Sequence, residues 1–166
     1  MRPIERIIDQ LNAAFGGKAW YGPPLRNLLD GVTQEQATAH PIPGAHSILE
    51  LVVHAGTWID VVARRLRGEP IESTTVEDWS NATKTTFAVA IEELEHAESR
   101  LLDAVARLTP EDLDRKVPGH KHSVYAEIHG VLQHNVYHAG QIALLKKADL
   151  LATDALKGTP DLKTRS

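Results

Sequence analysis

Hydrophobic residues recur at three- and four-residue steps along four long segments of the chain, a pattern that favours a helical fold. The four segments span residues 3–15, 47–67, 82–108 and 123–148. Each segment has an apolar stripe along one helical face, whereas no stretch of useful length alternates apolar and polar residues as a strand would. The sequence therefore predicts an all-α fold, a four-helix bundle with short accessory helices.

Local signals mark several helix ends. Ser47 and Glu50 form an S-x-x-E capping box at the start of the second long helix. That helix closes with three arginines, followed by Gly68, which is typical of a C-terminus. A short helix is expected at residues 25–29, and Thr109 with Pro110 predicts one further turn.

The length of 166 residues fits one domain with its own core. We expect residues 1–152 to form the bundle domain. Residues 153–166 are polar and contain Gly158 and Pro160, so we expect a loose C-terminal tail there.

Composition excludes several classes of function. The net charge of −4 predicts no nucleic-acid partner, and no run approaches the ~20 apolar residues of a membrane helix. The chain has no cysteine, which excludes disulfides, thiolate ligands and a cysteine nucleophile. The N-terminus lacks the apolar stretch of a signal peptide, so a cytoplasmic location is expected.

Nine histidines are the unusual feature of the composition, because imidazole is the commonest metal ligand in proteins. His134 and His138 are four residues apart, so they point about 40° apart around one helix and can reach a common point. Both lie on or beside the stripe of Val131 and Ile142, where a histidine pair is costly unless it is hydrogen-bonded or coordinated. The pair predicts a metal site.

A third ligand must come from another helix, and His54 in the second long helix is the candidate. Three neutral imidazoles suit zinc, nickel or ferrous iron and leave positions open for water or substrate. Alternatively, the three histidines form a hydrogen-bonded core network without a metal.

Three further polar residues are candidates for supporting roles. Glu50 lies one turn before His54 and could orient it or accept a proton, although the capping box explains Glu50 by itself. Gln141 could hydrogen-bond a metal-bound water or a partner helix, and Glu127 could support the histidines. The remaining histidines are assigned to loops, to a charged solvated face, or to no predicted partner: His40, His46, His96, His120, His122 and His129.

The segment from Ser47 to His54, together with the H-x-x-x-H-x-G-Q segment from His134 to Gln141, resembles the DinB-like superfamily, which includes bacillithiol transferases and relatives of mycothiol-dependent maleylpyruvate isomerase. The resemblance implies a bundle with up-down-down-up connectivity, often a homodimer. It also implies a nickel- or zinc-type metal on His54, His134 and His138.

Two reactions remain open for such a site. The metal could lower the pKa of bound water towards about 7 for hydrolysis of a small-molecule substrate, or it could bind a low-molecular-weight thiol cosubstrate for S-transfer. Glu50 is the candidate proton acceptor of the first route. The alternative is a non-catalytic metal-binding or dimerisation module.

Overall fold

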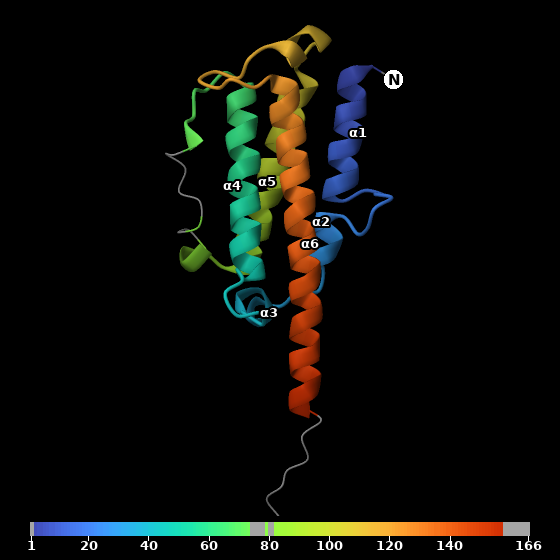
Figure 1. The fold of residues 1–166 in the computed structure, drawn as a ribbon, viewed down its shortest axis with the longest axis vertical. Coiled ribbons are helices and arrows are strands. Elements are labelled where there is room, and N and C mark those ends of the chain that lie inside the picture. Colours follow the sequence, from blue (N-terminus) through green and yellow to red (C-terminus); the bar gives the residue numbers. More distant parts are fainter. Residues whose placement is uncertain (1, 74–78, 80–81, 158–166) are drawn as a thin grey trace, which may run out of the picture.

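The computed structural model describes residues 2–73, 79 and 82–157, and its long elements are all helices (Figure 1). Four long helices make the bundle: α1 (Pro3–Phe15), α4 (Ile48–Leu66), α5 (Phe87–Ala106) and α6 (Val124–Lys157). Short elements connect them: α2 (Leu25–Leu29), α3 (Gln34–Thr38) and the 3-10 turns η2 (Ala82–Lys84) and η3 (Pro110–Asp114). The predicted all-α bundle with accessory helices is confirmed.

The long helices follow the expected up-down-down-up order. In Figure 1 the chain descends along α1, ascends along both α4 and α5, and descends along α6. Because α4 and α5 start at the same end, the chain between them has to return along the bundle. A helix of 19 residues, such as α4, is about 28 Å long, which accounts for the length of this connection.

Helix α4 packs against both α5 and α6 and makes most of its contacts with α5. Its apolar side chains fill the centre of the bundle, where Leu51, Val52, Ala55 and Ile59 are buried. Burial of these side chains removes apolar surface from water and supplies the main driving force for packing. The side of α4 that faces α6 carries His54.

The third long helix begins later than the periodicity predicts. The expected start is Ala82, but α5 begins at Phe87 and residues 82–84 form the separate turn η2. Thr86 adopts an extended conformation, with φ −99° and ψ 161°, and its hydroxyl accepts from the Val89 amide. An extended N-cap residue of this kind starts a new helix.

The fourth helix ends later than expected. The prediction of an end at Ala148 is wrong, because α6 continues to Lys157. Residues 149–157 contain no glycine or proline and are mostly good helix formers, so nothing stops the helix. Residues 158–166 of the expected tail lie outside the described residues, and the domain boundary at 152 stays a prediction.

The short helix α3 has no counterpart among the predicted helices. Its signal is a T-x-x-Q capping box, in which Thr33 and Gln36 each satisfy the other's backbone amide. None of the helices in the described part of the chain combines the length and the apolar character needed to cross a bilayer.

Candidate metal centre

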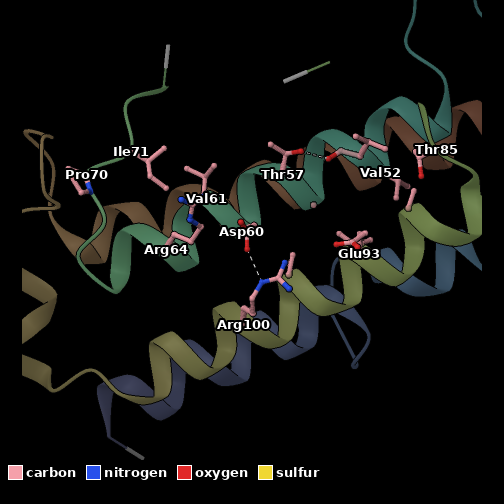
Figure 2. Close-up of a pocket in the computed structure, with 15 residues that line it drawn as sticks. Val52, Thr57, Asp60, Val61, Arg64, Pro70, Ile71, Thr85, Glu93 and Arg100 are labelled. Atoms are coloured by element: carbon pink, nitrogen blue, oxygen red, sulfur yellow. Dashed lines mark hydrogen bonds and ion pairs between the residues drawn. The ribbon is translucent and has the colours of Figure 1, made fainter. Parts of the chain in front are cut away.

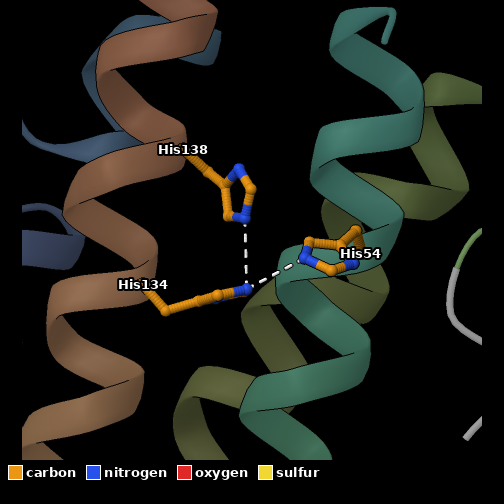
Figure 3. Close-up of side chains that lie close together, drawn as sticks. All are labelled: His54, His134 and His138. Atoms are coloured by element: carbon orange, nitrogen blue, oxygen red, sulfur yellow. Dashed lines mark hydrogen bonds between the residues drawn. The ribbon is translucent and has the colours of Figure 1, made fainter.

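Three histidines from two helices point at one another in the space between α4 and α6 (Figure 3). The Nε2 atom of His134 lies 2.9 Å from Nε2 of His54 and 3.1 Å from Nε2 of His138. The potential ligand atoms of all three lie within 4.8 Å of one another. Pairing across the bundle therefore brings the predicted residues together.

The helical pattern explains how α6 delivers its two histidines. Val131 and Ile142 of the predicted stripe are buried, and so is Leu145 one turn farther along α6. His138 lies in this stripe with 6% of its surface exposed, and His134 is half-buried one turn earlier. On α4, His54 also has 6% exposed and adjoins Ala55 in the core.

Amide oxygens on α6 decide which ring nitrogen faces the cluster. Gln141 Oε1 lies 2.5 Å from Nδ1 of His138. An amide oxygen can only accept, so Nδ1 carries the proton and Nε2 keeps its lone pair. Asn135 Oδ1 lies 3.4 Å from Nδ1 of His134 and favours the same tautomer there.

The donor set fits a divalent cation. In the tautomers that the amide oxygens favour, the Nε2 lone pairs of His134 and His138 face each other 3.1 Å apart, and one cation would satisfy both of them together with the Nε2 lone pair of His54. Two imidazole nitrogens bound at 2.0–2.1 Å are about 3.0–3.4 Å apart, depending on the angle at the ion. The observed 2.9 and 3.1 Å are close to this range. No Asp, Glu or fourth His of the described residues joins the cluster.

Aromatic side chains surround the three imidazoles. Trp58 approaches the rings of His54 and His134 edge-on, each with centroids 6.5 Å apart. Trp79 stacks on His54, and Tyr137 lies beside His138 at 5.2 Å. Sequence reasoning missed Trp79, whose signal is a large aromatic residue within an otherwise polar connection.

The family model of the DinB superfamily matches residues 24–142, a range that includes all three histidines and Gln141. The chain belongs to the DinB superfamily. A crystal structure described as the conserved protein of a locus from Enterococcus faecalis has the same fold, with a TM-score of 0.69 at 15% identity. The alignment covers 89% of this chain and 97% of that one. No protein of curated function matches the sequence.

In this DinB-superfamily bundle, Glu50 is held by groups at the start of α4. Its Oε2 accepts from the Ser47 amide at 2.7 Å and lies 3.2 Å from Nε2 of His40 and 3.5 Å from Nδ1 of His46. Partial burial alone would raise the pKa of Glu50, but the hydrogen bonds from Ser47 and His40 lower it overall. The capping box is confirmed, and a role as proton acceptor stays a prediction.

Glu127 faces a different cluster, so the expectation that it supports the metal ligands is wrong. Its Oε1 accepts from Arg65 at 2.9 Å, and its Oε2 pairs with His122. Arg65 is itself buried, donates to the Ile71 carbonyl, and lies over the Trp58 ring. The carboxylate is directed to the arginine because a buried charge needs a partner.

The remaining histidines lie outside the cluster. His96 is exposed, as predicted, and His129 packs beside Tyr125. His120 contacts the Ile71 carbonyl. Glu50 pairs with both His40 and His46, and the sequence did not suggest either pairing.

A separate cavity of 660 Å³ opens on the α5 side of α4 (Figure 2). Its polar residues include Asp60 and Arg100, which form an ion pair at 2.7 Å. None of the three clustered histidines lines this cavity. The three-histidine cluster and the cavity therefore lie on different faces of α4.

Proposed function

We propose that this DinB-superfamily protein is a metal-dependent enzyme that acts on a small molecule, with His54, His134 and His138 as ligands of one divalent ion. The convergence of three Nε2 atoms, two of them on rings whose Nδ1 faces an amide oxygen, carries the proposal. Zinc, nickel and ferrous iron all suit such a donor set.

A bound divalent ion would supply Lewis acidity towards either a water or a thiol. The chain itself holds the ligand rings: Gln141 orients His138, and the stripe of α6 keeps the pair one turn apart. For hydrolysis, Glu50 is the candidate proton acceptor. For S-transfer, the absence of cysteine means that the thiol comes from a low-molecular-weight cosubstrate.

The metal content of the purified protein is the first test. We expect about one zinc, nickel or iron ion per chain in the wild type, and none in His138→Ala. His129→Ala is the matched control, because His129 is on the same helix but packs against Tyr125 instead. A wild-type protein that binds no metal after reconstitution would contradict the proposal.

Two assays then separate the reactions. In S-transfer, the thiol sulfur bonds to an electrophilic carbon, the leaving group departs with its bonding electrons, and the thiol proton passes to solvent. In hydrolysis, water adds to an ester carbonyl and the alcohol leaves. Turnover of an alkylating electrophile only with thiol supports the first, and thiol-independent ester cleavage supports the second. Either activity has to disappear in His138→Ala.

Burial favours a second candidate, a non-catalytic metal-binding or dimerisation module. His54 and His138 are each only 6% exposed, and Trp79 covers one face of His54. Stoichiometric metal without either activity would support this candidate over the enzyme.

We also propose a cytoplasmic homodimer, on the strength of the family resemblance. Light scattering on the eluting protein tests the oligomer. A mass near 18.2 kDa at micromolar concentration would contradict the dimer.

A further inference from the structure

Trp79 lies in the connection between α4 and α5, and its indole is stacked on the imidazole of His54. The ring centroids are 4.0 Å apart and the planes differ by 9°. His46 stacks on the same indole, with centroids 3.7 Å apart and planes 7° apart. Two imidazoles cannot share one face at these distances, so the three rings form a stack with Trp79 in the middle.

We propose that Trp79 is a positioning residue of the metal centre: it holds the imidazole plane of His54 and favours the metal-bound form of that ring. The inference rests on the proposed metal site. It concerns a residue in a segment that contributes no ligand.

The first argument is geometric. The χ2 torsion of histidine has a broad energy profile, so a ring on a helix needs neighbours to hold its plane. Amide oxygens of Gln141 and Asn135 face the Nδ1 atoms of the two rings on α6. On His54, the flat face of the indole adds to the ring's hydrogen bonds and limits rotation about χ2, while Nε2 stays directed at His134.

The second argument is electrostatic. An imidazole bound to a divalent ion carries part of the ion's positive charge, and the indole face is the most electron-rich aromatic surface in proteins. The stack is therefore stronger when His54 is metal-bound. By linkage, an interaction that favours the bound state raises the affinity for the metal.

The outer side of the stack is anchored to the start of α4. His46 Nδ1 lies 3.5 Å from Glu50 Oε2, which also accepts from the Ser47 amide. His46 and Glu50 thus brace the indole from the side away from the cluster. Loss of the His46 ring frees one face of Trp79 without removing a group from the three ligands.

Zinc affinity, measured by competition with a chromophoric chelator, tests the proposal. We expect Trp79→Leu to weaken binding about tenfold, the low end of the effect of removing groups that support metal ligands. Trp79→Phe keeps a flat ring and should restore most of the affinity. His46→Ala should give a smaller loss. Trp20→Leu is the matched control, because Trp20 is 95% exposed and contacts Tyr21 instead.

A spectroscopic measurement covers the case in which Trp79→Leu folds poorly. The double variant Trp20→Phe/Trp58→Phe keeps Trp79 as the sole tryptophan, and Ni²⁺ should quench its emission with an endpoint of one ion per chain. The variant that keeps only Trp20 should show no such endpoint.

The outcomes are distinguishable. Equal zinc affinity in wild type and a folded Trp79→Leu variant, or unquenched Trp79 emission at full metal occupancy, overturns this inference and leaves the proposed function intact. A wild type that binds neither zinc nor nickel overturns both.

Discussion

At the scale of single residues, the side-chain amide of Gln141 determines what His138 can do. Its Oε1 accepts from Nδ1 of His138, and its Nε2 lies 3.3 Å from the Tyr137 hydroxyl. The second contact supports this orientation of the amide, because the hydroxyl oxygen can accept from the NH₂ group. Gln141 therefore holds the ring with Nε2 towards His134.

Gln141→Leu should weaken zinc binding by about 10- to 100-fold, because the ring loses the acceptor that sets its tautomer. Gln141→Glu keeps an acceptor and should retain the affinity. Chelator competition measures both, with Gln133→Leu, an exposed position on the same helix, as the control. Unchanged affinity in Gln141→Leu would show that the hydrogen bond does not matter for the site.

Glu98 is a carboxylate outside the metal centre that pairs with Arg26. It is fully buried in α5, where Arg26 donates to its Oε2 at 2.8 and 2.5 Å. Its Oε1 has no hydrogen-bond partner within the described part of the chain. Burial raises the pKa of Glu98, and the attraction to Arg26 opposes that rise only in part.

This raised pKa predicts a pH dependence of stability. A carboxyl whose folded pKa exceeds its unfolded value of about 4.5 contributes stability below that value, and the contribution is lost as the pH rises through the folded pKa. Glu98→Gln cannot ionise. The difference in free energy of unfolding, wild type minus Glu98→Gln, should therefore decrease as the pH rises from 4.5 to 8. Urea titrations of both proteins measure the difference; a difference that grows with pH would contradict the assignment.

At the scale of elements, capping and backbone composition decide where the helices stop. Periodicity alone predicts that four long helices exist, because core-facing residues recur with the helical repeat. It misplaces the start of α5 and the end of α6, since both depend on a cap or a breaker rather than on the stripe. Substitutions at Gly130, within α6, and at Gly17, after α1, test how backbone composition affects the stability of a helix and of its end.

Gly130 lies within α6 at an exposed position, and a Cβ atom there would meet nothing within 4 Å. Gly130→Ala should therefore raise the free energy of unfolding by about 0.5–1 kcal/mol, because glycine loses more backbone freedom than alanine in a helix. Gly17→Ala should instead destabilise, since its Cβ would lie 2.9 Å from the Asn12 carbonyl oxygen. Urea unfolding measures both; a destabilised Gly130→Ala would mean that α6 is packed more closely there.

At the scale of the whole molecule, the three histidines join α4 to α6, two elements that lie far apart in the sequence. A metal bound by both helices binds the folded state alone, so it should stabilise the entire bundle. This stabilisation can be measured without knowing any substrate.

Zinc should raise the melting temperature of the wild type, and a chelator should reverse the shift. At a free concentration 100 times Kd, one site contributes about 2.7 kcal/mol to stability. His54→Ala should show no shift, whereas His129→Ala should respond as the wild type does. Circular dichroism at helical wavelengths follows the transition, and an equal shift in His54→Ala would place the zinc elsewhere.

Sequence patterns alone predict the helical class, the accessory helix at residues 25–29, and the residues that could meet as ligands. These inferences succeed because the helical repeat is local: four residues make one turn, so the side that His134 and His138 share is set within a single segment.

The side chains that surround the cluster could not be predicted from these patterns, because they depend on how the helices pack. Trp79 reaches His54, and Glu127 pairs with Arg65 rather than with the histidines. The spacing of these contacting residues in the sequence does not follow the helical repeat, so periodicity cannot predict the contacts. They form when the helices pack, because buried charges need partners of opposite charge and buried polar groups need hydrogen bonds.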